Sequence, residues 1–184
     1  MKLTVRYDAL TPDLYARVRA SADFFPYDPD DVRAALDGSF CTAVVYADDE
    51  PAGIGRVVAD GRIAFFIKDL VVLPQYQGCG IGSAVLEALV ARIRLSCCDH
   101  AYVGLLAATG KEGFYERHGF LRRPTNDLGS GMIRFVDHIA PSSPDQCPPP
   151  RGQASAEPVI EAVDAPSVPQ AWREGSVGAE PVSA

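Results

Sequence analysis

The stretch LPQYQGCGIGS, residues 73–83, places three glycines within five positions, between an apolar run and a stretch with helical spacing. Glycine adopts positive φ angles at little cost and lets a ligand approach the main chain closely. A helix that begins directly after such a turn presents free N–H groups and the positive end of its dipole. The stretch therefore predicts an anion-binding turn between a strand and a helix.

Two common phosphate-binding patterns do not fit this turn. A P-loop needs a Lys followed by Ser or Thr after its last glycine, and residues 81–83 supply no Lys. A dinucleotide fingerprint that starts at Gly78 has Ser83 at its third glycine position, and one that starts at Gly80 has Val85 there. Nucleoside triphosphates and dinucleotides are thus disfavoured as ligands.

The rest of the chain reads as alternating strands and helices in the order βααβββαβαβ. Alternating or apolar runs predict strands at 2–7, 40–47, 52–59, 62–73, 101–107 (buried) and 132–136. Helices are predicted at 11–22, with Thr11 as N-cap and Pro12 in the first turn, at 29–36, from the glycines to about 95, and at 111–118. The three strands between 40 and 73 are separated by turn residues, which predicts an antiparallel meander.

Composition divides the chain into a folded domain, residues 1–138, and a tail, residues 139–184. The tail holds nine of the fifteen prolines, and its two basic and six acidic residues give it a charge of 2 − 6 = −4 out of −7. With one aromatic residue, it buries too little apolar surface to offset chain entropy. The tail is therefore predicted to be disordered.

Charge and cysteine usage restrict the class of protein. The first 20 residues lack an apolar segment long enough for a secretory signal, and no run approaches a membrane span. The five cysteines are odd in number and form no C-x-x-C pair, so neither a disulfide framework nor a zinc site is expected. An acidic chain also disfavours nucleic acid as a partner. We expect a cytoplasmic protein without metal, membrane or nucleic-acid binding.

Two stretches carry a resemblance to a known family. LVVLPQYQGCGIGSAVLEAL resembles the acyl-CoA-binding motif of the GNAT superfamily of N-acyltransferases, with Gln77, Gly80 and Gly82 at the motif positions. Downstream, GFYERHGF, residues 113–120, resembles the second signature of that family. Together the two resemblances span residues 62–120.

The resemblance implies a fold, a reaction and a binding site. The fold is α/β (α+β), the GNAT acyl-CoA N-acyltransferase fold, with a mixed central sheet flanked by helices. The reaction is N-acetyl transfer from acetyl-CoA to a primary amine by direct attack in a ternary complex. The implied coenzyme A contacts, mostly main chain, are Leu70, Val71, Val72, Gln77, Gly78, Cys79, Gly80, Ile81, Gly82 and Ser83. Cys79 stands where the family often carries a basic residue.

The same resemblance assigns two catalytic candidates. Asp69 lies near the end of the strand that faces the acyl group in the family, where it would accept the amine proton; the alternative is a salt bridge to a neighbouring base such as Lys68. Tyr115 matches the family tyrosine that bonds the departing thiolate; the alternative is a core tyrosine beside Phe114 and Phe120. The thioester oxygen would bind a main-chain N–H at a strand bulge near residues 70–71.

The acceptor site is the least defined. Phe24, Phe25 and Tyr27 precede the second predicted helix and form either an aromatic acceptor wall or part of the core. Tyr76 and the 111–132 stretch are similar to plant-type serotonin N-acetyltransferases, which favours a small arylalkylamine. Protein N-termini, lysine side chains and polyamines stay open as acceptors, and a non-catalytic acyl-CoA sensor stays open as a function. A homodimer is also an expectation.

Overall fold

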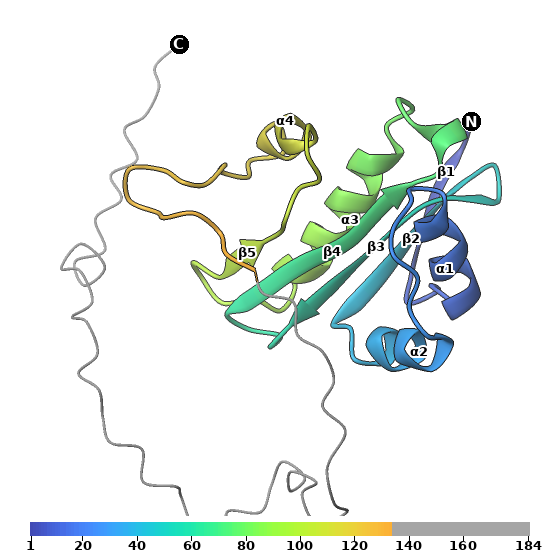
Figure 1. The fold of residues 1–184 in the computed structure, drawn as a ribbon, viewed down its shortest axis with the longest axis horizontal. Helices are drawn as coiled ribbons and strands as arrows, with labels where there is room; N and C mark the ends of the chain where they lie inside the picture. The colour runs from blue at the N-terminus through green and yellow to red at the C-terminus, as the bar shows by residue number, and fades with distance from the viewer. Residues whose placement is uncertain (134–184) are drawn as a thin grey trace, which may run out of the picture. The chain divides into compact units, whose positions relative to one another are not determined.

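The computed structural model describes residues 1–133, and the fold lies in the unit Met1–Gly131 (Figure 1). Of a second unit, Met132–Ala184, only the first two residues are described, and neither is in a strand. The rest of the strand expected at 132–136, the boundary at 138 and the tail at 139–184 lie outside the described residues.

A five-stranded mixed sheet forms the centre of the domain, with its strands side by side in chain order. The strands are β1 (Leu3–Tyr7), β2 (Cys41–Ala47), β3 (Glu50–Ala59), β4 (Ala64–Val72) and β5 (Tyr102–Gly104). The first four pair antiparallel, and β5 pairs parallel to β4. The mixed sheet and the antiparallel meander are therefore confirmed.

One strand prediction was wrong in length and burial. The strand expected at 101–107 is only three residues long, and its first residue, Tyr102, is 56% exposed. Within the described part of the chain, β5 pairs on one side alone, so its outer edge faces away from the ladder. A short edge strand of this kind need not be apolar throughout.

Helices cover both faces of the sheet (Figure 1). The helices α1 (Pro12–Ala20) and α2 (Pro29–Asp37) lie on one face, α3 (Ile81–Arg94) lies on the other, and α4 (Glu112–Glu116) follows β5. As predicted, Thr11 caps α1: its Oγ1 accepts a hydrogen bond from the N–H of Leu14 at 3.3 Å. The fold class expected from the sequence is thus confirmed.

Helix α3 packs closely on β3 because two glycines of that strand face it. A Cβ atom at Gly53 would lie 2.7 Å from a methyl group of Ile81, and one at Gly55 would lie 2.8 Å from Val85. The apolar side of α3 is fully buried against the sheet at Val85 and Leu89. Each such side chain stabilises the fold by roughly 1.5–3 kcal/mol. This packing fixes where α3 begins relative to the end of β4.

A bulge in β4 changes which face its side chains occupy. Arg56 pairs with Lys68 and Ile54 pairs with Val71, so Asp69 and Leu70 together oppose Gly55, and Asp69 has a φ of +55°. An extra residue of this kind reverses the alternation of a strand. Before the bulge, Phe65 and Ile67 pack in the core beneath α3, whereas after it Val71 packs beneath α1 and α2. The bulge therefore delivers the Asp69 side chain to the face that α1 covers.

Candidate functional site

The glycine cradle, residues 77–83, joins the end of β4 to α3 after a single turn of 3-10 helix, η1 (Pro74–Tyr76). Gly78 has a φ of +77° and Gly80 a φ of +80°, a conformation that side chains disfavour. A Cβ atom on either glycine would have no atom within 4 Å, so the space above the turn is open. The strand–turn–helix arrangement predicted from the three glycines is confirmed.

The N-terminus of α3 presents main-chain donors to this open space. Gly80 is the N-cap and supplies no side-chain hydrogen bond. The first N–H that bonds back along the helix is that of Ala84, which donates to the Gly80 carbonyl at 3.0 Å. The N–H groups of Ile81, Gly82 and Ser83 precede it and have no intrahelical partner. This end of the helix therefore suits an anion.

Helix α4 packs against the cradle and so joins the two sequence signatures. A Cβ atom on Gly82 would lie 3.4 Å from the Phe114 ring. The Ser83 hydroxyl and the Nε2 atom of His118 form a hydrogen bond of 3.0 Å, and the His118 ring lies edge-on to Phe114 with centroids 4.8 Å apart. No residue pattern in the sequence indicated that His118 reaches the cradle.

The edge of β4 that faces β5 is paired only at its beginning. Three residues of β4, Ala64, Phe65 and Phe66, pair with β5. Further along, the N–H of Leu73 donates to the Ala52 carbonyl at 2.9 Å, which makes Val72 and Gly53 a non-hydrogen-bonded pair of the β3–β4 ladder. The main-chain groups of Val72 therefore point away from β3, toward the open edge.

The predicted coenzyme A contacts on β4 divide between the two edges. The Val72 carbonyl, on the open edge, accepts a bond from the Gln77 side chain at 3.3 Å. The main chain of Val71 faces β3 opposite Ile54, and Leu70 lies at the bulge. The structure thus places the main chain of Val72 on the open edge and leaves that of Val71 in the ladder.

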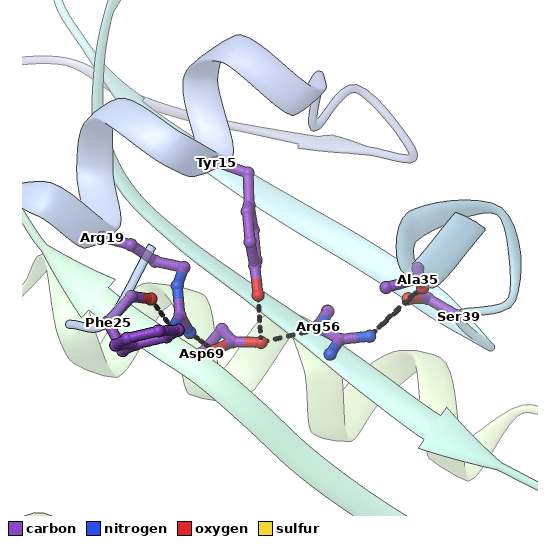
Figure 2. Close-up of polar contacts among 7 residues, drawn as sticks. All are labelled: Tyr15, Arg19, Phe25, Ala35, Ser39, Arg56 and Asp69. Carbon is purple, nitrogen blue, oxygen red and sulfur yellow. Dashed lines mark hydrogen bonds and ion pairs between the residues drawn. The ribbon is translucent and has the colours of Figure 1, made fainter. Parts of the chain in front are cut away.

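A buried ion cluster lies on the face of β4 that α1 covers (Figure 2). It is formed by Tyr15, Arg19, Arg56 and Asp69. Arg19 Nη1 donates to Asp69 Oδ1, while Arg56 Nε donates to Oδ2 at 2.7 Å and the Tyr15 hydroxyl donates to Oδ2 at 3.0 Å. The Asp69 side chain is only 4% exposed. Both oxygens of this carboxylate therefore already have protein donors.

The ion cluster corrects the partner expected for Asp69. A salt bridge was predicted as the alternative to catalysis, with Lys68 as an example, but Lys68 is exposed and the carboxylate pairs with Arg19 and Arg56. Burial, followed by the negative charge of Asp69, raises the pKa of Tyr15 to about 12, so this phenol stays a donor. Sequence reasoning missed Tyr15, Arg19 and Arg56, which lie up to 54 residues from Asp69.

The aromatic segment, residues 24–27, lies beside the ion cluster. Phe24, Phe25 and Tyr27 are 42%, 75% and 51% exposed, which excludes the core alternative. The Phe24 and Tyr27 rings lie 4.9 and 5.0 Å from the Arg19 guanidinium carbon. Tyr76 is not among these contacts; it packs against the core beneath α3.

Tyr115 is half-buried on α4, between the rings of Phe114 and Phe120 at centroid distances of 5.0 and 6.0 Å. Burial raises the pKa of its phenol. Its hydroxyl has no hydrogen-bond partner within residues 1–133. Tyr115 thus packs beside Phe114 and Phe120, as the alternative to a catalytic role predicted. Among the described residues, its hydroxyl is still free to donate a hydrogen bond.

Within the described residues, no three His, Cys, Asp or Glu side chains gather in the manner of metal ligands. Every helix of residues 1–133 is too short or too polar to cross a bilayer.

Comparison with known proteins identifies relatives along most of the described chain. The family profile described as an acetyltransferase (GNAT) domain matches residues 38–122. The serotonin N-acetyltransferase 2, chloroplastic, of Oryza sativa subsp. japonica is 32% identical over 119 residues, which are 61% of this chain and 57% of that protein. The GCN5-related N-acetyltransferase 1, chloroplastic, of Arabidopsis thaliana is 33% identical over 85 residues, 46% of this chain and 42% of its own length. The chain therefore spans about half the length of these curated relatives.

A solved structure matches more completely. A protein of unknown function from meticillin-resistant Staphylococcus aureus, described as a probable acetyltransferase, superimposes with a TM-score of 0.63 at 31% sequence identity. The match covers 73% of this chain and 100% of that one.

Proposed function

This chain belongs to the GNAT family of acetyltransferases, and on that premise we propose that it transfers the acetyl group of acetyl-CoA to a primary amine by direct attack. The observation that carries the proposal is the placement of the β4 bulge. On one side it adjoins the open edge of β4 that leads to the glycine cradle, and on the other the ion cluster and the aromatic segment. A thioester could therefore approach this main-chain position from the open edge of β4, and an amine could approach it from the face that α1 covers.

The coenzyme A portion would bind main-chain groups. The N–H groups of residues 81–83 suit a pyrophosphate, and the open-edge groups of Val72, with Leu70 at the neighbouring bulge, would suit the amides of an extended pantetheine arm. A bound arm would compete with the Gln77 side chain for the Val72 carbonyl. These contacts depend on backbone geometry, which explains why glycine spacing is their sequence signature.

The bulge supplies a candidate donor for the thioester oxygen. Because Asp69 and Leu70 together oppose one residue of β3, the ladder leaves main-chain groups at the bulge without a strand partner. A main-chain N–H aimed at a developing oxyanion is typically worth about 3 kcal/mol of transition-state stabilisation. The bulge residues are Asp69 and Leu70, and the resemblance implied a donor near residues 70–71.

The incoming amine must lose a proton. An alkylamine has a pKa near 10.4, so its neutral form costs roughly 4.6 kcal/mol at pH 7. Asp69 is the proposed acceptor of this proton, but its side chain is buried and three donors already occupy most of the roughly four acceptor positions of its carboxylate. We therefore propose that Asp69 accepts the proton through water and not by direct contact with the amine.

Tyr115 is the proposed partner of the departing thiolate. Its hydroxyl is free among the described residues, and burial raises the pKa of the phenol, which keeps it protonated at neutral pH. A phenol is a weaker acid than an ordinary thiol, so hydrogen bonding to the sulfur, with proton transfer following from solvent, is the simpler role.

The proposed acceptor is a small arylalkylamine. The exposed rings of Phe24, Phe25 and Tyr27 beside the ion cluster offer stacking surfaces for an aromatic amine. The rice relative is named a serotonin N-acetyltransferase, which supports the same class. Tyr76 is a weaker candidate because it packs beneath α3. Location in the cytoplasm and a homodimer stay predictions, the latter testable by light scattering.

Release of free thiol from acetyl-CoA tests the proposal. Serotonin, tyramine, spermidine and an N-terminal peptide would be compared, and we expect the two aromatic amines to give the highest kcat/KM. Tyr115→Phe should lower kcat about 30-fold with acetyl-CoA affinity within about twofold, because only the departing sulfur loses its donor. The exposed Glu116→Gln on the same helix is the matched control.

Two results would contradict the proposal. Tight binding of acetyl-CoA with no thiol release for any acceptor would identify an acyl-CoA sensor instead. Faster release with spermidine or the peptide than with either aromatic amine would keep the enzyme and overturn the acceptor class.

A further inference from the structure

Arg19 joins two parts of the molecule that the proposed reaction uses separately. Its Nη1 atom donates to Asp69 at the β4 bulge, and its Nη2 atom donates to the main-chain carbonyl of Phe25 at 3.1 Å (Figure 2). The guanidinium is nearly fully buried. One planar group, 50 residues before Asp69 in the chain, thus connects the bulge to the aromatic segment.

The aromatic segment has few other attachments. It lies between α1 and α2, follows Asp23 with its φ of +56°, and keeps its rings largely exposed. The Phe24 and Tyr27 rings lie on the Arg19 guanidinium, and the Phe24 N–H donates to the Arg19 carbonyl at 3.3 Å. Within the described residues, Arg19 is therefore the centre around which this segment is arranged.

Arg56 provides an internal contrast. It donates to the same carboxylate, but its Nη1 donates to the Ala35 carbonyl and to the Ser39 hydroxyl, both at 3.2 Å. Arg56 thereby ties the bulge to the end of α2, and within residues 1–133 none of its hydrogen bonds goes to residues 24–27. The two guanidinium groups share one anion and differ in what lies at their other end.

We propose that Arg19 is a positioning residue that sets the aromatic segment against the β4 bulge and so determines acceptor recognition. The inference rests on the proposed function, because it takes residues 24–27 as the acceptor side of the site. Acceptor recognition and the acyl-binding bulge are then coupled through the single Arg19–Asp69 pair. Arg56 stabilises the bulge without affecting the acceptor.

The shape of the guanidinium is essential to this role. Two nitrogens of one fork reach Asp69 and Phe25 at the same time, and the flat group also lies against the rings of Phe24 and Tyr27 as well as that of Tyr15. A lysine ammonium keeps the charge but is a compact donor without a flat face. Arg19→Lys should therefore retain pairing with Asp69 and lose the hold on residues 24–27.

The kinetic test compares Arg19→Lys with Arg56→Lys, and with Arg17→Met as a control at an exposed position of the same helix. With serotonin as acceptor, Arg19→Lys should raise the acceptor KM about tenfold, the typical worth of a charge-assisted hydrogen bond, while the acetyl-CoA Kd changes less than about twofold. Arg56→Lys should leave the acceptor KM within about twofold. Equal rises in KM for both variants, or wild-type KM for Arg19→Lys, would overturn the proposal.

Hydrogen exchange gives a readout that does not depend on the reaction. In the protein without substrate, the amides of residues 22–28 should exchange about tenfold faster in Arg19→Lys than in Arg56→Lys, with melting temperatures of the two variants as the check on folding. Equal exchange in both variants would overturn the positioning role. If the wild-type protein turns over no amine, the proposed function fails, and the exchange comparison still decides whether Arg19 positions the segment.

Discussion

The glycine cradle lies beyond the end of β4, before α3, whereas the ion cluster lies on the β4 face that α1 covers, and the two are built in opposite ways. The cradle is a backbone turn of seven consecutive residues, 77–83, in which Gly78 and Gly80 face open space. The cluster uses four side chains from α1, β3 and β4, all buried, with one carboxylate between two guanidinium groups. One site is a shape of the backbone, whereas the other is a set of charges that the fold must bring together.

Because of this difference, changes in the cradle should affect mainly ligand affinity, whereas changes in the ion cluster should affect mainly the free energy of unfolding. A main-chain site exposes its donors before any ligand arrives, so changes there should alter binding more than folding. A buried ion cluster has already replaced water with protein partners, so removal of one member leaves the others uncompensated. Variants in the two regions should therefore fail in different assays.

The largest effect is expected for Asp69→Ala. Loss of the carboxylate leaves Arg19 and Arg56 buried without their anion, which should cost about 3–5 kcal/mol of the free energy of unfolding. Urea denaturation measures this loss, with the exposed neighbour Lys68→Ala as control. A loss below about 1 kcal/mol would show that the cluster contributes little and that Asp69 is free for chemistry.

Gly80→Val should weaken acetyl-CoA binding about 100-fold. The valine side chain would disfavour the φ of +80° and occupy the space above the helix N-terminus, where a phosphate would bind. Gly61→Val is the matched control, since Gly61 has a φ of +82° at the turn before the opposite end of β4. Calorimetric titration checks both; equal losses of affinity would show that strain alone, and not the cradle, explains the effect.

Cys79→Arg should strengthen acetyl-CoA binding about fivefold, roughly 1 kcal/mol, because it adds a positive charge at an exposed position of the cradle. The gain should shrink as salt is raised from about 0.05 M to 0.5 M, since screening weakens exposed charges. Affinity that falls, or a gain that salt does not change, would argue against a phosphate at this position.

The smallest effect concerns Tyr15 and alkaline pH. Its pKa is raised to about 12, so the protonated phenol stabilises the fold fully below pH 10, and this contribution is lost as pH rises from 10 to 12. Tyr15→Phe should lower the free energy of unfolding by about 1 kcal/mol at pH 7, because one hydrogen bond is lost. The same variant should show a smaller decline of this free energy above pH 10. Unfolding measured at pH 7 and pH 11 checks this; an unchanged slope would contradict the assigned pKa.

Much of the fold could be read from local patterns. Thr11 and Pro12 marked the start of α1, and the turn residues between 47 and 63 marked the meander, because caps and turns are decided by neighbours in the chain. The glycine cradle belongs to the same class. Its backbone conformation depends on residues that lie within a few positions of one another.

The bulge could not be read in this way. Strict alternation along β4 would place Asp69 on the same face as Phe65 and Ile67, beneath α3. The strand contains no glycine or proline that would indicate an extra residue. The bulge moves Asp69 to the other face, where Arg19 and Arg56 arrive from α1 and β3. The partner suggested by proximity in sequence, Lys68, was accordingly the wrong one.

The sequence alone determined the helix and strand types, the glycine cradle and, through two signatures, the family. The tertiary structure decided the face that Asp69 occupies, its two guanidinium partners, and the exposure of residues 24–27 around Arg19. The physical reason is range: backbone conformation is set by adjacent residues, whereas a buried charge takes its partners from whichever segments the sheet and helices bring within hydrogen-bonding distance.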